Sequence, residues 1–208
     1  MDNQQEDQLR IRAAFPFNLS PNVDVVLDIV QRHPLRPDRD AIAMGNLLSF
    51  KVGTEFLHIP SRQYYLEPKL DSVKTLSVIE QTILACLFTR NYDGFIRQKY
   101  LEKIVTQNEE WVIPYIFQLV GEYVVEITNI IWTNLENLDK PRYINFGREN
   151  PRFMDLTRRR VLSYWAEYYR SQYNNFADYP GYKVLNALGL WGEAKEARNL
   201  LNVNHNCG

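Results

Sequence analysis

The chain has 208 residues, which is enough for one ordinary domain with a substantial core. Hydrophobic residues make up 45% of it, and 24 basic residues nearly balance 25 acidic ones, so the composition is globular rather than disordered. A formal net charge of −1 excludes a global electrostatic attraction to nucleic acid or to an anionic membrane. Any binding to a polyanion must therefore depend on a local cluster of cations.

The N-terminal segment, residues 1–19, is predicted to be a flexible tail. It begins MDNQQEDQLRIRAAF, which is acidic and rich in amides where a secretory signal would need a basic start and an apolar stretch. The two cysteines, Cys86 and Cys207, have no metal-ligand spacing and form no disulfide framework. We therefore expect a reducing, cytoplasmic location, with no bound metal and no cofactor.

Helices are predicted at three places in the first half of the chain. Ser20, followed by a proline, is a good start for an apolar helix. Ser77 and Glu80 form a capping box at the head of a helix that is apolar almost all round and should be buried. Residues 92–107 have the alternation of faces that is typical of an amphipathic surface helix.

The segment from 40 to 59 has two interpretations. Helical spacing over 40–52 is shown by four residues, Ala41, Met44, Leu48 and Val52. The strings LLSFKV and EFLHI, on either side of Gly53, alternate instead like the strands of a hairpin. The spacing favours a helix over 40–52, and a short hairpin near 48–59 stays open as the alternative.

Residues 110–136 are predicted to form one long helix at the centre of the domain. Its polar residues fall in a stripe of roughly 80°, and they are Gln118, Glu122, Glu126, Asn129 and Thr133. A carboxylate at mid-bilayer costs on the order of 2.5 to 3.5 kcal/mol, so the segment belongs in a protein core and we expect no membrane contact. Together with the helix at 92–107 it resembles a HEAT-like helical hairpin, over roughly 45 residues and without a repeat elsewhere in the chain.

A further helix is predicted to begin at Asn150 and Pro151 and to run to about residue 174. Shorter helices follow it. The chain is therefore predicted to be all-α, with about seven or eight helices in a single domain over 20–202 and a C-terminal tail at 203–208.

The string TRRRVLSYWAEYYRSQY, residues 157–173, combines arginines with aromatic residues. At 100° per residue, Arg158, Arg159 and Arg160 point to three different sides of a helix, so they do not form one patch. Arg158 falls within the apolar arc and either reaches solvent at the helix start or forms a buried pair with Glu122 or Glu126. The candidate contacts for a partner or for nucleic acid are Arg152, Arg159, Arg160 and Arg170.

Glu122, Glu126 and Asn129 are predicted to line a possible polar cleft on the central helix. The two glutamates, one turn apart, could hold a metal or divide acid and base roles. A dimetal site in a helix bundle also uses Glu-x-x-His motifs, and this sequence has none. The favoured interpretation is a solvated seam on an otherwise buried helix.

Three functions from different classes remain open. The sequence lacks the nucleophile-elbow, phosphate-loop, dinucleotide and zinc-protease motifs. The leading hypothesis is a non-catalytic helical module with an adaptor, regulatory or inhibitory role, which binds another protein or itself. Thirteen tyrosines and four tryptophans favour it, because they supply large contact areas. The alternatives are a nucleic-acid-associated protein using the basic region 140–170 and a small enzyme using Glu122 and Glu126.

Overall fold

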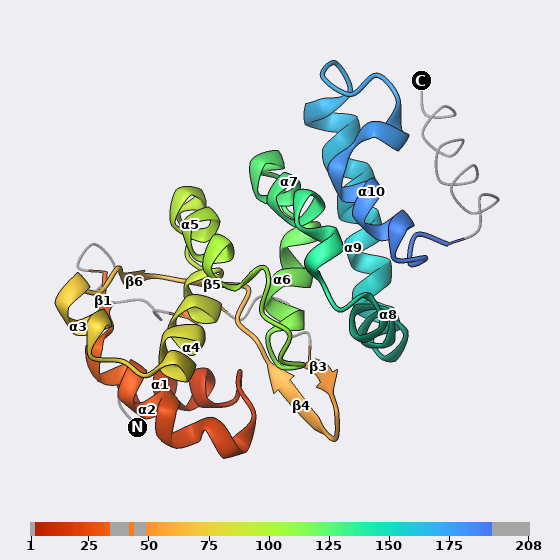
Figure 1. The fold of residues 1–208 in the computed structure, drawn as a ribbon. Helices are drawn as coiled ribbons and strands as arrows, with labels where there is room; N and C mark the ends of the chain where they lie inside the picture. The colour runs from red at the N-terminus through yellow and green to blue at the C-terminus, as the bar shows by residue number, and fades with distance from the viewer. Residues whose placement is uncertain (1–2, 34–41, 44–48, 193–208) are drawn as a thin grey trace.

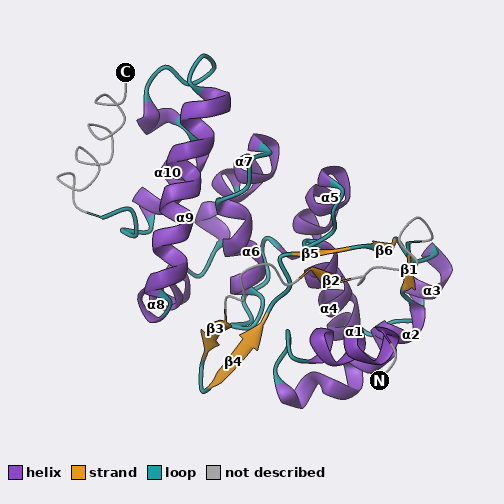
Figure 2. Ribbon diagram, turned by 180° about the vertical axis from the view of Figure 1, so that it is seen from behind, coloured by secondary structure: helices purple, strands orange, loops and turns teal. Residues whose placement is uncertain are grey.

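The computed structural model describes residues 3–33, 42–43 and 49–192. In these ranges the protein is mostly helical, with ten α-helices and six short strands. Helices α1 and α10 lie at opposite ends of the molecule (Figures 1 and 2). No helix within the described ranges is both long and apolar enough to cross a membrane.

The helices fall into two groups along the chain. The first group holds α1 (Asn3–Arg12), α2 (Ser20–Ile29), α3 (Leu70–Lys74), α4 (Val78–Phe88) and α5 (Gly94–Ile104). The second group holds α6 (Ile113–Val120), α7 (Val125–Thr133), α8 (Lys140–Glu149), α9 (Pro151–Tyr164) and α10 (Pro180–Ala187). A π-helical turn, Trp165–Tyr169, follows α9, so the regular helix ends earlier than predicted.

The strands form three antiparallel pairs. These are β1 (Gln31–Arg32) with β6 (Tyr65–Leu66), β2 (Ile42–Ala43) with β5 (Arg62–Gln63), and β3 (Ser49–Val52) with β4 (Glu55–His58). Their presence means that the all-α prediction holds only as a mostly helical fold, and the number of helices exceeds the number expected.

The hairpin near 48–59 is confirmed by β3 and β4, which pair from Ser49 with His58 to Val52 with Glu55. Gly53 joins them with a φ of 57°, a left-handed value that glycine adopts at little steric cost. The alternation of the strands buries Phe50 fully. The helix favoured over 40–52 is therefore wrong at residues 42–43 and 49–52, and the rest of that segment lies outside the described residues.

The N-terminal segment, which was expected to be a flexible tail, forms helix α1. The end of α1 and the residues that follow it pack on the core. Ile11 and Ala14 are fully buried. The hydroxyl of Tyr115 donates a hydrogen bond of 2.7 Å to the carbonyl oxygen of Ala14 and so ties this segment to α6. The predicted C-terminal tail, 203–208, lies outside the described residues.

The predicted long helix over 110–136 is wrong, because α6 and α7 are separated by a break at residues 121–124. Gly121 ends α6, and two backbone groups beyond it bond to a distant side chain instead of to a helix. The hydroxyl of Tyr169 donates to the carbonyl of Tyr123 at 2.7 Å and accepts from the amide of Val125 at 3.3 Å. These bonds replace helical ones and stabilise the break.

The interior of α6 and α7 agrees largely with the apolar pattern. Buried side chains on these two helices include those of Ile116, Leu119, Val120, Ile127 and Ile131, whereas Ile130 is only partly buried. Tyr123 is 49% exposed, however, and Val124 is only partly buried. The break turns these two side chains away from the direction that a continuous helix would give them.

Candidate functional site

Glu122 lies inside the protein among arginines. It is 5% exposed. Nη2 of Arg62 donates to both carboxylate oxygens, at 3.2 and 3.1 Å, and Nε of Arg97 lies 3.1 Å from Oε2. Arg90, which follows α4, is 3% exposed and also lies within the electrostatic reach of Glu122. We call Arg62, Arg90, Arg97 and Glu122 the arginine cluster.

The arginine cluster is assembled from segments far apart in the sequence. Arg62 comes from β5, Arg97 from the first turns of α5, and Glu122 from the break after α6. Both ribbon views show α5 and α7 side by side, with β5 running past the lower end of α5 (Figures 1 and 2). Tertiary packing therefore brings the charges together.

Sequence reasoning missed the three arginines of this cluster. For Arg97 a signal exists, because it precedes the buried Leu101 and Ile104 by one and two helical turns and so belongs to the inward face of α5. Arg62 lies in a short strand, and Arg90 follows the end of a buried helix. Neither of these two positions has a local pattern that distinguishes a buried arginine from an exposed one.

The hydrogen bonds of the cluster are incomplete. Nη1 of Arg97 donates to the carbonyls of Asn91 and Tyr92 at 3.0 Å each. Nη2 of Arg90 donates to the carbonyl of Ser61 at 3.2 Å, and Nη1 of Arg62 donates to the same carbonyl at 2.8 Å. Within the described part of the chain, Nε and Nη1 of Arg90 and Nη2 of Arg97 have no hydrogen-bond acceptor.

Charge in the cluster is also unbalanced, since among the described residues three guanidinium groups lie near one carboxylate. Burial and, to a smaller extent, the positive charge of Arg62 lower the pKa of Arg90 to about 9, although Glu122 acts in the opposite direction. Arg90 still carries its charge at neutral pH. The cluster therefore keeps an excess of positive charge inside the protein.

A row of tyrosines lies on the surface beside the cluster. The ring of Tyr123 contacts that of Tyr164 with centroids 6.3 Å apart, and Tyr164 contacts Tyr168 at 6.2 Å. Tyr168 is 65% exposed. Arg160, one turn before Tyr164 on α9, is exposed and lies against Gly121 at the break. We call Tyr123, Tyr164, Tyr168 and Arg160 the tyrosine face.

The tyrosine face and the arginine cluster adjoin each other. The guanidinium carbon of Arg97 lies 5.9 Å from the ring centroid of Tyr123, within the range of a cation–π contact. The side chain of Arg62 is 29% exposed and gives the cluster an opening to the surface. Positive charge thus lies both behind the exposed aromatic rings and beside them.

The predicted cleft of Glu122, Glu126 and Asn129 is not one stripe on a helix. Glu122 lies in the break and is buried, whereas Glu126 and Asn129 are exposed on α7. The interpretation of Glu122 as a solvated residue is therefore wrong. The physical reason is the loss of helical periodicity at Gly121, because Glu122 then no longer points in the same direction as Glu126 and Asn129 on α7.

The predicted arginine contacts lie on the surface. Exposed side chains belong to Arg152, Arg159, Arg160 and Arg170. Arg158 is partly buried, and neither predicted glutamate is its partner. It donates to the carbonyl of Leu190 at 2.7 Å and pairs with Asp155 on its own helix. Contact with nucleic acid stays a prediction for these residues.

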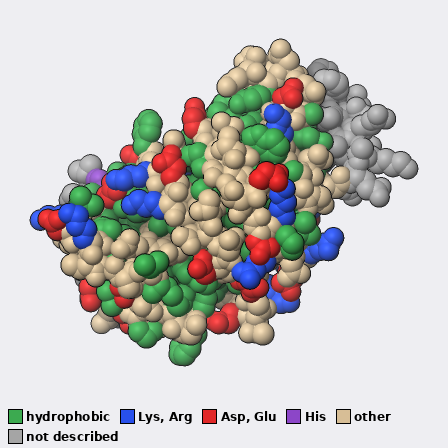
Figure 3. Space-filling model, viewed as in Figure 1, with side chains coloured by type: hydrophobic (Ala, Val, Ile, Leu, Met, Phe, Trp, Pro, Cys, Tyr) green, Lys and Arg blue, Asp and Glu red, His purple; other side chains and the backbone are tan. Residues whose placement is uncertain are grey.

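Acidic residues lie among the basic ones in and around the region 140–170. Lys140 pairs with Glu136 at 2.7 Å, and Arg142 pairs with Asp139 at 3.1 Å. On the face that Figure 3 shows, acidic side chains are likewise interspersed with Lys and Arg side chains. These pairs reduce the net field that a phosphate backbone would meet.

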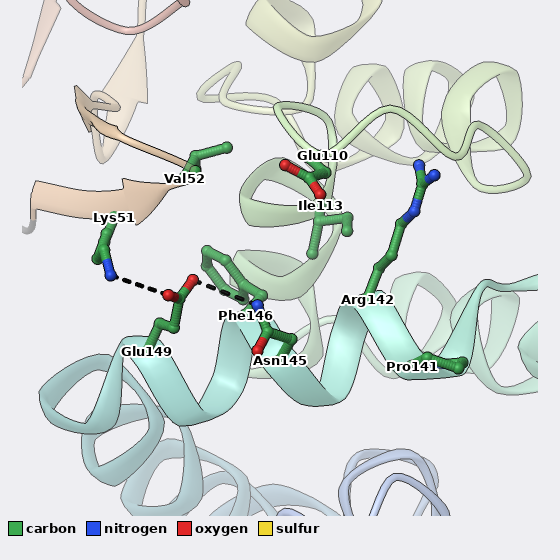
Figure 4. Close-up of a pocket in the computed structure, with 10 residues that line it drawn as sticks. Lys51, Val52, Glu110, Ile113, Pro141, Arg142, Asn145, Phe146 and Glu149 are labelled. Atoms are coloured by element: carbon green, nitrogen blue, oxygen red, sulfur yellow. Dashed lines mark hydrogen bonds and ion pairs between the residues drawn. The ribbon is translucent and has the colours of Figure 1, made fainter.

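A separate surface pocket of about 310 Å³ lies between the β3–β4 hairpin, the start of α6, and α8 (Figure 4). Nζ of Lys51 contacts Glu149 at 2.9 Å, and Nδ2 of Asn145 donates to the same carboxylate at 3.4 Å. Arg142 bonds to the carbonyl of Asn108. Most of the charged groups in the pocket therefore hold the hairpin and the helices together.

The described residues include neither a metal-binding group of side chains nor a reactive cysteine. No group of three or more His, Cys, Asp or Glu side chains there could hold a metal ion. Cys86 is fully buried, and burial raises the pKa of its thiol well above the usual value, so it is not a nucleophile at neutral pH.

Comparison with protein-family models, with curated proteins and with solved structures gave no match. Function is therefore inferred from the tyrosine face and the arginine cluster alone.

Proposed function

We propose that this protein is a non-catalytic helical module that binds another protein through the tyrosine face. The observation that carries the proposal is the row Tyr123, Tyr164 and Tyr168, whose rings contact one another while Tyr123 and Tyr168 stay largely exposed. Tyrosine and arginine are enriched among the residues that dominate binding energy at protein interfaces. Rings held in place by one another also lose little conformational freedom on binding.

The partner is expected to be acidic where it meets this face. Arg160 is exposed beside the tyrosines, and Arg62 is partly exposed above a cluster that has an excess of positive charge. Complementary charge raises the association rate and rejects basic partners. An acidic segment that also carries apolar side chains would satisfy both the arginines and the rings.

An enzymatic role for Glu122 is less favoured. Its carboxylate accepts from Arg62 and lies 3.1 Å from Nε of Arg97, so both of its oxygens are engaged by arginine side chains. Glu126 is exposed on α7, whereas Glu122 is buried in the break, so the two carboxylates do not share one environment.

A selection experiment tests the proposal. A random peptide library is displayed and selected against the full chain, and the affinities of the selected peptides are measured for the wild type and for variants. We expect acidic peptides, with at least about tenfold weaker binding after Tyr168→Ala or Arg160→Glu, which corresponds to about 1.4 kcal/mol. Phe56→Ala is the matched control, because Phe56 is 61% exposed on β4, outside the tyrosine face.

Two outcomes would contradict the proposal. In the first, all three variants bind the selected peptides with the same affinity as the wild type. The other is tight binding of single-stranded oligonucleotides at physiological salt that Tyr168→Ala abolishes, because stacked aromatic rings with arginines also suit unpaired bases. The second outcome would favour the nucleic-acid alternative, and it is measured with labelled oligonucleotides at two salt concentrations.

A further inference from the structure

The arginine cluster contains hydrogen-bond donors that the described protein residues leave without acceptors. They are Nε and Nη1 of Arg90 and Nη2 of Arg97, on side chains of residues that are 3% and 0% exposed. Nε of Arg97 also makes no hydrogen bond, although it lies 3.1 Å from Oε2 of Glu122. More than nine in ten buried polar groups in folded proteins have a partner. Several free donors on neighbouring buried arginines therefore require a specific explanation.

The charge of the cluster limits which kind of group can accept these hydrogen bonds. A neutral acceptor would complete the hydrogen bonds but would leave the positive charge uncompensated, and an unpaired buried charge is strongly unfavourable. Among the residues that the structure describes, Glu122 is the carboxylate that pairs with Arg62 and Arg97, and the charges of Arg62, Arg97 and Arg160 also repel Arg90. A second negative group would balance the charge and accept the free hydrogen bonds at the same time.

We infer that the arginine cluster is a recognition site for a dianionic phosphate group carried by the protein partner, with Arg90 and Arg97 donating the free hydrogen bonds and Arg160 closing the outer side. The inference rests on the proposed function for the source of the phosphate. Guanidinium groups bind phosphate through paired, charge-assisted hydrogen bonds. A phosphorylated side chain carries close to two negative charges at neutral pH. Two negative charges compensate the excess positive charge of the cluster better than the single charge of a carboxylate does.

The approach to the cluster passes the tyrosine face. Arg62 is partly exposed, and Tyr123, whose ring covers Arg97, is itself half exposed in the break between α6 and α7. The free donors are covered, so entry of a phosphate requires the Tyr123 side chain to rotate outward. The rest of a bound peptide would then lie along Tyr164 and Tyr168.

The first arm of the test uses inorganic phosphate with the full chain. Calorimetric titration at constant ionic strength, with chloride as the balancing salt, should show saturable binding. Arg160→Gln should weaken it at least about tenfold, while Arg159→Gln, the neighbouring exposed arginine on the same helix, should leave it unchanged. Arg90→Lys keeps the charge but loses the planar fork and should also weaken binding. Circular dichroism verifies that each variant folds.

The second arm uses peptides chosen by the library selection, each made with phosphotyrosine, phosphoserine or glutamate at its acidic position. We expect the phosphorylated forms to bind at least about tenfold more tightly than the glutamate form, and inorganic phosphate to compete with them. Arg160→Gln should remove most of this preference, and Arg159→Gln should preserve it.

The possible failures can be told apart. Absence of saturable phosphate binding, or equal loss in Arg159→Gln and Arg160→Gln, overturns the phosphate site. Selected peptides that bind the tyrosine face without preference for phosphate also overturn it and leave the proposed function standing. Saturable binding of inorganic phosphate without binding of any peptide overturns the partner as the source and shows instead a site for the free anion.

Discussion

Arg97 and Glu122 form an ion pair in the interior of the protein: Nε of Arg97 lies 3.1 Å from Oε2 of Glu122, and the side chains are 1% and 4% exposed. The pair joins α5 to the break between α6 and α7. Because both groups are removed from water, each depends on the other for compensation of its charge.

The first prediction follows from this pair. Glu122→Gln should lower the free energy of unfolding by about 3 to 5 kcal/mol, since it removes the negative partner of the buried Arg97 and of the partly buried Arg62. Glu126→Gln is the control, and it should change stability by at most about 0.5 kcal/mol because Glu126 is exposed. Chemical denaturation of both variants makes the comparison. Equal effects would show that Glu122 is not held as an essential buried charge.

A second prediction concerns the hydroxyl of Tyr169, which serves the backbone of the break. Tyr169→Phe removes the acceptor of the Val125 amide and the donor to the Tyr123 carbonyl, and should cost about 1 to 3 kcal/mol. Amide exchange at Val125 should become faster. Tyr168→Phe, at a 65% exposed position, should change neither quantity. An unchanged exchange rate in Tyr169→Phe would argue against the role given to its hydroxyl.

The third prediction tests the packing of α7. Ile127 is fully buried, so Ile127→Ala should lower the free energy of unfolding by about 2 to 5 kcal/mol through lost apolar contacts and a residual cavity. Ile130→Ala, at a partly buried position on the same helix, should cost less. The denaturation midpoints of the two variants decide the matter, and a smaller loss for Ile127→Ala would contradict the observed orientation of α7.

The fourth prediction concerns alkaline pH. Burial raises the pKa of several tyrosines above 10, so their neutral form stabilises the fold below about pH 10 and this contribution is lost as pH rises further. These tyrosines are Tyr65, Tyr100, Tyr115, Tyr143 and Tyr179. Arg90 has the opposite effect. Its pKa is lowered to about 9, so its contribution to the free energy of unfolding increases as the pH rises above that value.

Since the tyrosines outnumber Arg90, the free energy of unfolding should fall between about pH 10 and pH 12. Denaturation at a series of pH values measures the fall, and the ultraviolet absorbance of tyrosinate should rise together with unfolding. Tyrosinate that forms fully while the protein stays folded would show that these hydroxyls are not buried as described.

The parts of the fold that depend on near neighbours could be predicted from the sequence. Ser77 accepts from the amide of Glu80, and the Glu80 side chain accepts from the amide of Ser77, so the start of α4 is determined within four residues. The alternation around Gly53 likewise contained the hairpin as the weaker of two interpretations. The helical spacing was misleading there. In the hairpin the ring of Phe50 packs against those of Phe146 and Phe153 in the core, and this contact favours the strand.

The break at 121–124 could not be predicted in this way. Its stability depends on the hydroxyl of Tyr169, 46 positions from Tyr123, and on Arg62, 60 positions from Glu122. An apolar segment with two glutamates at helical spacing is compatible with a continuous helix until those distant partners are known. The candidate site has the same limitation, because its four charged residues come from β5, the turn after α4, α5 and the break.

The charge distribution of the arginine cluster also constrains how the chain can be divided. All three arginines come from the segment before α6, while the carboxylate that balances them comes after it. A fragment that ends at residue 112 would therefore present Arg62, Arg90 and Arg97 without Glu122. Such a fragment should be less stable than the same residues in the full chain, and adding the complementary fragment in trans should stabilise it.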